Sequence, residues 1–295
     1  MESTEQIYNQ VREHYSTASR SKAPKYGESV AKSFGYTEEE LSNIPEDANL
    51  GLSCGNPLAI TSLKEGETVI DLGSGAGFDI FLASTKIGST GRAIGVDIND
   101  EMLARAEKIK VSRGSSVSNV SFIKGNITSV PLPDETADLI ISNCVVNLVP
   151  YEEKHLVFRE MYRLLKPGGR VAVSDILAKK PLPEMLGKDI AMYVGCIAGA
   201  AIVADYEKWF KEAGFKEAVI TDTKADLNVY LETNEDGTKK SGDCCGPAAV
   251  VPACCGGDDA TAAPSCTSAA PSGNTEEKTD LNEFVGSFKI FAVKG

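Results

Sequence analysis

The sequence predicts an α/β protein: a doubly wound, mostly parallel seven-stranded sheet with a helical N-terminal extension. Short apolar runs typical of buried parallel strands alternate along the chain with stretches of helical spacing. The first run, residues 68–72, leads directly into a glycine-rich turn, residues 73–77. Strands that alternate with helices in this way form an open sheet covered on both faces. A chain of 295 residues is long enough for one large domain of this class.

The first 60 residues are predicted to form the helical extension, which carries Cys54. Within it, Thr37 and Glu40 have the spacing of a capping box, so a helix is expected to begin after Thr37. Pro45 cannot continue that helix, which therefore ends before it.

The main domain is predicted over residues 61–233, and residues 281–295 return to it as its last strand. Asn99 is placed to cap the helix after the second strand, and Pro167 with the two glycines behind it stops a helix over residues 155–165. A further helix follows the glycine-rich turn. The seven predicted strands span residues 68–72, 93–98, 120–123, 137–142, 170–175, 218–221 and 288–293.

Charge and hydropathy limit the partners of this chain. Acidic residues outnumber basic ones by 42 to 30, a net charge of −12, and phosphate binding needs basic patches, so we expect no nucleic-acid partner. The longest apolar run, residues 190–204, is shorter than the roughly 20 residues of a membrane span, and we expect a buried helix there and no membrane partner.

The first twenty residues are polar and mixed in charge, without the apolar segment of a secretion signal. We therefore expect a cytoplasmic protein. In such reducing surroundings its eight cysteines should be thiols rather than structural disulfides.

Residues 234–280 are predicted to be a mobile insertion between the sixth and last strands. They are rich in small and polar residues, with almost no large apolar side chains to offset the entropy of ordering. Their cysteines do not have the spacing of a zinc site, and their role is left open. These cysteines are Cys244, Cys245, Cys254, Cys255 and Cys266.

The turn after the first strand is a candidate nucleoside-cofactor loop, built on Gly73, Gly75 and Gly77. Its glycines allow a sharp turn and a close approach of backbone N–H groups to a ligand. Asp71 would repel a pyrophosphate but suits a cationic amine, such as the ammonium group of S-adenosylmethionine. Asp97, at the end of the second strand, is placed to accept hydrogen bonds from ribose hydroxyls. The alternative is a tight strand-to-helix turn without a ligand.

Together these motifs resemble class I S-adenosylmethionine-dependent methyltransferases over about residues 60–225. The resemblance rests on residues 69–77, Asp97, residues 125–133 and residues 164–169. It implies the class I methyltransferase fold and S-adenosylmethionine as cofactor. Its implied adenosine-binding residues are Met102, Asn126 and Ile127. The family more often has Asp at the position of Asn126, and Met102 could equally be an ordinary core residue.

Three cysteines lie in separate local motifs around this loop: Cys54 in a Gly-Asn-Pro turn, Cys144 directly after the fourth strand, and Cys196 in an apolar stretch. Each alone is explained by burial, since free cysteine is among the most buried residue types. Together the three motifs closely resemble those of arsenite methyltransferases. The resemblance implies that the three thiolates bind trivalent arsenic as substrate, either arsenite or methylarsenite.

The chemistry fits this resemblance, because soft thiolates select soft centres. Trivalent arsenic keeps a lone pair that can accept a methyl group, so no general base is needed, and neither His14 nor His155 has a predicted role. Methylation oxidises arsenic, and in the family an external thiol reductant, thioredoxin or glutathione, restores it.

Two other functions remain open at this stage. The chain could methylate another small molecule, such as a quinone or sterol, although it offers no obvious base. It could also be a thiol protein that sequesters metalloids through the cysteines of the insertion.

Overall fold

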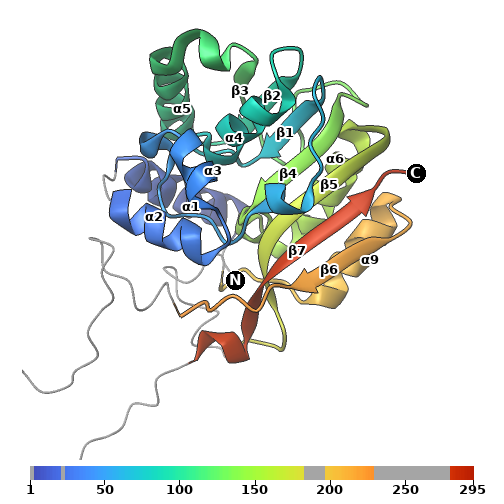
Figure 1. Ribbon diagram of the computed structural model, residues 1–295. Coiled ribbons are helices and arrows are strands. Elements are labelled where there is room, and N and C mark those ends of the chain that lie inside the picture. Colours follow the sequence, from blue (N-terminus) through green and yellow to red (C-terminus); the bar gives the residue numbers. More distant parts are fainter. Residues whose placement is uncertain (1–2, 21–23, 183–196, 229–279) are drawn as a thin grey trace, which may run out of the picture.

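The seven predicted strands form one sheet in the order β3-β2-β1-β4-β5-β7-β6 (Figure 1). The structure is a computed structural model, and it describes residues 3–20, 24–182, 197–228 and 280–295. The strands are β1 (Thr68–Leu72), β2 (Arg92–Asp97), β3 (Val120–Lys124), β4 (Ala137–Asn143), β5 (Leu165–Ala178), β6 (Ala218–Asp222) and β7 (Val285–Val293).

Strands β1 to β5 pair in parallel, and β7 runs antiparallel between β5 and β6. The prediction of a doubly wound, mostly parallel seven-stranded sheet is therefore confirmed. The chain moves outward in opposite directions from β1 and β4, which are neighbours. In open α/β sheets a ligand crevice forms at the carboxyl ends of two such strands.

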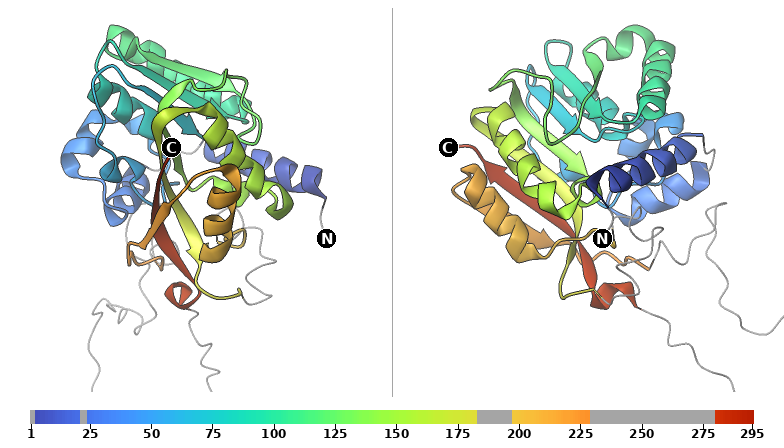
Figure 2. Two further views of the ribbon diagram at one scale, coloured as in Figure 1. Left: turned by 90° about the vertical axis from the view of Figure 1, so that its right-hand side faces the viewer. Right: turned by 180° about the vertical axis from the view of Figure 1, so that it is seen from behind.

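Helices cover both faces of this sheet (Figure 2). On one face, α4 and α5 share a hydrophobic cluster with Val69. On the other, α6 and α9 share a cluster with Ile70 and Leu72. Successive residues of β1 thus point to opposite, buried faces, which explains its unbroken apolar sequence. The four helices are α4 (Phe78–Ile87), α5 (Asp100–Arg113), α6 (Lys154–Leu164) and α9 (Val203–Ala213).

The N-terminal residues form three helices, α1 (Thr4–Ala18), α2 (Pro24–Ser33) and α3 (Glu38–Asn43), followed by two short 3-10 helices, Glu46–Ala48 and Pro57–Ile60. The capping box before α3 is present as predicted.

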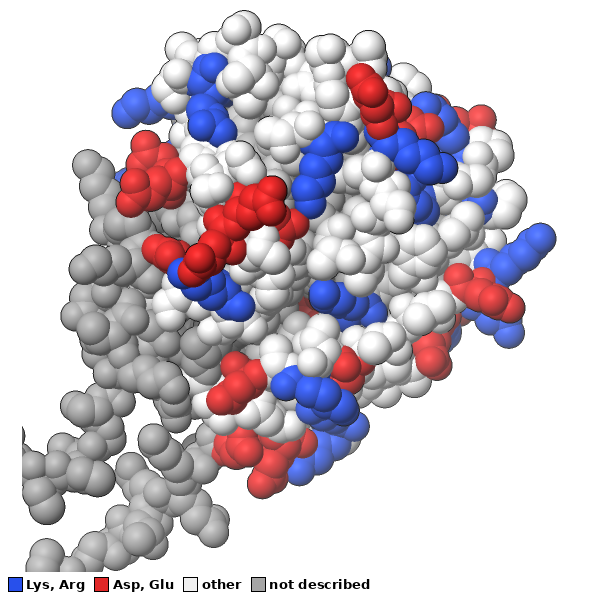
Figure 3. All heavy atoms as spheres, viewed as in Figure 1, with Lys and Arg blue, Asp and Glu red and all other residues white. Residues whose placement is uncertain are grey.

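Ion pairs link the N-terminal extension to the sheet domain. Glu40 binds Lys86 of α4 at 2.9 Å, and Arg20 binds Glu101 of α5 at 2.7 Å. Acidic and basic side chains lie interspersed on the face seen in Figure 3. The charges visible there do not gather in one patch of a single sign.

Two local expectations differ from the structure. The described part of the predicted helix over residues 190–204 is a turn followed by an isolated bridge between Ile202 and Ala178, and α9 begins only at Val203. In this segment, Ile202 pairs with the end of β5 and does not continue a helix. Strand β5 begins at Leu165, ahead of the Pro-Gly-Gly sequence, because Leu165 already pairs with Ala137 of β4.

No helix in the described part of the chain combines the length and the apolarity that crossing a membrane requires. Of the predicted insertion, residues 234–279 lie outside the described residues.

Candidate cofactor and thiol site

A pocket lies at the carboxyl ends of β1 and β4, where the sheet topology predicts one. Its open space, mouth included, is about 1050 Å³. The glycine loop, the start of α5 and the segment after β4 form its walls, and Tyr8, Val11 and Arg12 of α1 line it from the N-terminal extension. The extension therefore completes the pocket.

The glycines of the loop have different physical roles. All three have positive φ, at 78° for Gly73, 51° for Gly75 and 90° for Gly77. A Cβ on Gly73 would lie 2.4 Å from the side chain of Val145, whereas one on Gly75 would meet only the Met102 sulfur, at 3.9 Å. Gly73 and Gly75 both line the pocket. Gly77 is absent from its lining and is the N-cap residue of α4 instead.

The two predicted cofactor carboxylates, Asp71 and Asp97, both line the pocket. Asp71 is 2% exposed, and burial with the nearby charges of Asp79 and Asp97 raises its pKa well above the usual value. Asp97 accepts 2.8 Å hydrogen bonds from the backbone N–H groups of Gly75 and Asn99. It therefore holds the glycine loop against the start of α5, a role that the sequence did not predict.

Asp79, at the start of α4, is a third carboxylate in the pocket lining. Burial raises the pKa of Asp79 to about 6 and also raises that of Asp97. The charges of Asp79 and Asp97 act on Asp71, and a cationic ligand beside Asp71 would offset them. The electrostatics of the pocket thus favour a cation near Asp71.

The three residues predicted at the adenosine all line the pocket. Met102 and Ile127 are 1% and 6% exposed and supply apolar surface. Met102 also packs in the core cluster of α4 and α5, so both of its anticipated roles are compatible with its position. The side-chain oxygen of Asn126 accepts a hydrogen bond from the backbone N–H of Thr128 at 3.1 Å.

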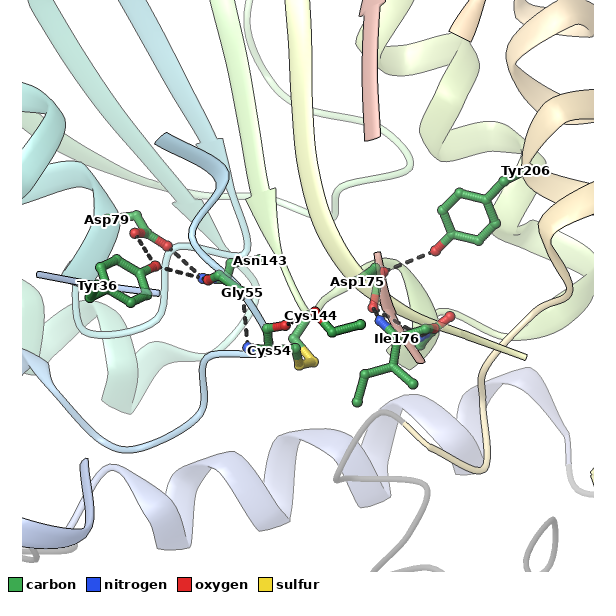
Figure 4. The surroundings of a disulfide bond; sticks show 11 residues. Tyr36, Cys54, Gly55, Asp79, Asn143, Cys144, Asp175, Ile176 and Tyr206 are labelled. Carbon is green, nitrogen blue, oxygen red and sulfur yellow. Dashed lines mark hydrogen bonds between the residues drawn. A yellow bond between two sulfur atoms is a disulfide. The ribbon is translucent and has the colours of Figure 1, made fainter. Parts of the chain in front are cut away.

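Cys54 and Cys144 lie together although 90 residues separate them in the sequence, and their sulfurs are joined in a disulfide (Figure 4). Their Cα atoms are 5.5 Å apart, a normal span for such a bond. The expectation of free thiols is therefore wrong for this pair in this structure. Cys144 lines the pocket and Cys54 does not, so the disulfide reaches the pocket wall through Cys144.

The third predicted thiol, Cys196, lies outside the described residues, as do the five cysteines of the insertion. Within the described part of the chain, no group of three or more His, Cys, Asp and Glu side chains is arranged to hold a metal ion.

A hydrogen-bond network beside Cys54 involves residues that the sequence analysis missed. Tyr36 donates to Asp79 at 2.6 Å, and the side-chain nitrogen of Asn143 lies 2.9 Å from Asp79 and 2.8 Å from the carbonyl oxygen of Gly55. The side-chain oxygen of Asn143 accepts from the backbone N–H of Cys54 at 3.1 Å. Figure 4 shows this network joining the N-terminal extension to the ends of β4 and α4.

A second network of the same composition lies on the other side of Cys144. Tyr206 donates to Asp175 at 2.9 Å, and Asn147 donates to Asp175 at 2.9 Å and to the carbonyl oxygen of Ile176 at 2.5 Å. Burial raises the pKa of Asp175 to about 6, although its hydrogen bonds and the Lys154 charge act in the opposite direction. Asn143 and Asn147 stand within the same motif as Cys144, the only sequence signal that could have pointed to them.

Comparison with known proteins agrees with the fold. Residues 63–214 match the family model of a methyltransferase domain. An arsenite methyltransferase from Halobacterium salinarum is 44% identical over 215 residues, which cover 69% of this chain and 54% of that protein. The human arsenite methyltransferase is 31% identical over 218 residues, which cover 71% of this chain and 56% of that protein. The chain thus spans about half the length of these relatives.

Among solved structures, an arsenic(III) S-adenosylmethionine methyltransferase from Chlamydomonas reinhardtii superposes with a TM-score of 0.55. The match has 23% identity and covers 90% of this chain and 73% of that one, which shows a shared class I methyltransferase fold. With the family model spanning more than half of the sequence, the chain belongs to the methyltransferase domain family.

Proposed function

We propose that this chain transfers a methyl group from S-adenosylmethionine to trivalent arsenic held by cysteine thiolates. One observation carries the proposal: Cys54 and Cys144 meet at the wall of the pocket that the glycine loop and Asp71 line. The similarity to arsenite methyltransferases supports the same substrate.

The residues of the pocket fit the proposed cofactor. S-adenosylmethionine, when bound, supplies a methyl group on a cationic sulfonium. The buried carboxylate of Asp71 would hold the ammonium group, and Asp97 retains acceptor capacity for ribose hydroxyls. Met102 and Ile127 would cover the adenine, and the amide of Asn126 would pair at its edge.

The substrate would be bound by sulfur. Reduced Cys54 and Cys144 provide two soft ligands, and Cys196 is the proposed third. Because arsenic carries a lone pair and no proton, these residues need only bind it and orient it, and no side chain has to remove a proton. Such positioning can lower a barrier by roughly 7–11 kcal/mol in the best intramolecular cases.

The disulfide must be opened before arsenic can bind. Two external thiols would reduce it to two cysteine thiols and leave as a new disulfide, so that the electrons balance. Thioredoxin or glutathione is the proposed reductant.

The test is methylation of arsenite by the full chain with S-adenosylmethionine and glutathione, followed by chromatographic speciation of arsenic. We expect methylated arsenic from the unaltered chain and none from Cys54→Ser, Cys144→Ser or Cys196→Ser. Each variant should still bind S-adenosylmethionine in calorimetry, which separates loss of the thiol from loss of the fold.

Full activity in one variant would remove that thiol from the site. Methylation of a quinone or sterol, with arsenite left unchanged, would contradict the proposed substrate. Deletion of residues 240–270 tests the sequestration alternative, which predicts that arsenic binding is lost while the core stays folded.

A further inference from the structure

Cys144 has a backbone conformation that its surroundings must maintain. Its φ is 59°, in the left-handed region that residues with a side chain rarely adopt. Such conformations are costly, persist only where neighbouring groups determine them, and cluster at functional sites. The backbone N–H of Cys144 donates to the carbonyl oxygen of Ser174 at 2.8 Å, which fixes one side of the residue.

The other side is fixed through Asn143, which joins the two cysteines. Its side chain accepts a hydrogen bond from the N–H of Cys54 and donates one to the carbonyl oxygen of Gly55. The two bonds bind the backbone on both sides of the Cys54 carbonyl. The same side chain lies 2.9 Å from both the Tyr36 hydroxyl and a carboxylate oxygen of Asp79. Asn143 directly precedes Cys144, so its side chain joins the Cys54 loop to the residue beside Cys144 (Figure 4).

Asn147 offers a comparison within the same chain. It also donates to a buried aspartate, Asp175, that accepts from a tyrosine, and to a backbone carbonyl oxygen. That carbonyl belongs to Ile176 of β5, whereas the carbonyl that Asn143 binds belongs to Gly55, next to Cys54. The two amides are therefore alike in chemistry and differ in what they attach.

We propose that Asn143 is a positioning residue that holds the Cys54 loop against Cys144 and so sets the reactivity of the two sulfurs as a pair. The value of this pairing for arsenic binding rests on the proposed function, but the positioning itself does not. The positioning determines how readily Cys54 and Cys144 form their disulfide by exchange with an external disulfide. In this exchange the two cysteine thiols give two electrons and two protons to the external disulfide. The S–S bond between the cysteines forms, and the external S–S bond breaks to give two thiols.

The experiment measures the effective concentration of the two thiols for each other. The full chain is equilibrated without oxygen in mixtures of reduced and oxidised glutathione. Differential alkylation and peptide mass spectrometry then give the fraction of the Cys54–Cys144 disulfide. The matched variants are Asn143→Asp and Asn147→Asp, which keep the side-chain shape, remove the N–H donor and bring a carboxylate beside Asp79 or Asp175.

We expect Asn143→Asp to lower the effective concentration by about tenfold or more, since its hydrogen bonds to the Cys54 loop are weakened. Asn147→Asp should change it by no more than about twofold, at a comparable loss of stability in urea. An unchanged value in Asn143→Asp, or equal losses in both variants, would overturn the proposal.

If either aspartate variant fails to fold, Asn143→Ala and Asn147→Ala replace the pair, with the same two expectations. The readout needs neither arsenite nor S-adenosylmethionine. A failure of the proposed function would therefore leave this result intact, and a failure here would leave the methylation test intact.

Discussion

The carboxylate of Asp97 accepts a 2.8 Å hydrogen bond from the backbone N–H of Gly75. The end of β2 thereby fixes the glycine loop that follows β1, and the neighbouring N–H of Asn99 is bound by the other carboxylate oxygen. A residue expected only to bind ribose also shapes the loop that would bind the rest of the cofactor.

Replacement of Asp97 by Asn should therefore weaken cofactor binding more than loss of one ribose contact would. The side chain of Asn has one acceptor oxygen and one NH2 donor, so it cannot accept from the two N–H groups through two oxygens as Asp97 does. The negative charge is also lost. We expect affinity for S-adenosylmethionine to fall by about tenfold or more in isothermal titration calorimetry. The exposed neighbour Asp100, which pairs with Lys124, provides the control: Asp100→Asn should keep the affinity. Equal affinities in the two variants would contradict this role for Asp97.

Gly73 and Gly168 provide a matched test of packing in the loop. Their φ values are nearly equal, 78° and 77°, but a Cβ on Gly73 would lie 2.4 Å from Val145, whereas one on Gly168 has no neighbour within 4 Å. Gly168→Ala should lower the free energy of unfolding by about 1 kcal/mol, because it adds only backbone strain. Gly73→Ala should cost a further 1–3 kcal/mol or so from overpacking. Urea unfolding measures both, and similar losses would show that contact with Val145 is easily relieved.

Asp175 should make stability depend on pH. Burial raises its pKa to about 6, above the value near 3.9 expected in the unfolded chain. The folded state then binds the proton more tightly than the unfolded chain does. Protonation of Asp175 therefore stabilises the folded state by at most about 3 kcal/mol. This stabilisation is complete below about pH 4 and is lost as the pH rises through 6.

The measurement compares the unfolding free energies of the unaltered chain and Asp175→Asn between pH 4 and pH 7. The variant lacks this titration, so its stability relative to the unaltered chain should rise with pH across that window. Two curves that stay parallel would show that Asp175 has an ordinary pKa in the folded chain.

Asn99 should control the attachment of α1. Its side-chain oxygen caps α5 by accepting from two backbone N–H groups, and its nitrogen donates to the carbonyl oxygen of Arg12 at 2.9 Å and to the Ser16 hydroxyl at 3.1 Å. Asn99→Ala should lower the free energy of unfolding by about 1 kcal/mol through loss of the cap. Loss of the hydrogen bonds to α1 should lower it by about as much again. We expect faster proteolytic cleavage within residues 4–18.

Thr37→Ala is the control for Asn99, since Thr37 caps α3 alone. It should lower stability by about 1 kcal/mol without faster cleavage of α1. Equal cleavage rates in the two variants would mean that α1 is attached by its other contacts.

The central strands could be predicted because they are short apolar runs between glycine or polar residues. Strand β1 is buried along its whole length, and burial on both faces leaves such a run few alternatives. The position of Cys144 followed from the same logic, since it comes directly after β4. The contact of Cys54 with Cys144 could not be derived in this way, because it depends on how the N-terminal helices pack on the sheet.

The networks around the two cysteines were not predictable for a related reason. Tyr36 and Asp79 are 43 residues apart, and neither stands in a pattern that indicates a buried hydrogen bond. The predicted helix over residues 190–204 is wrong for residues 197–202, because apolar composition alone does not distinguish a buried helix from a segment that pairs with the end of a strand.

The place of β7 in the sheet has a consequence for how the protein acquires its structure during synthesis. Strand β6 has β7 as its sheet neighbour, and β7 follows it only after the long stretch from residue 223 to residue 284. On the ribosome, β1 to β5 emerge with their parallel partners, whereas β6 has to wait for residues 285–293 before it can join the sheet. Until then the free edge of β5 is exposed in the nascent chain, open to unwanted strand pairing.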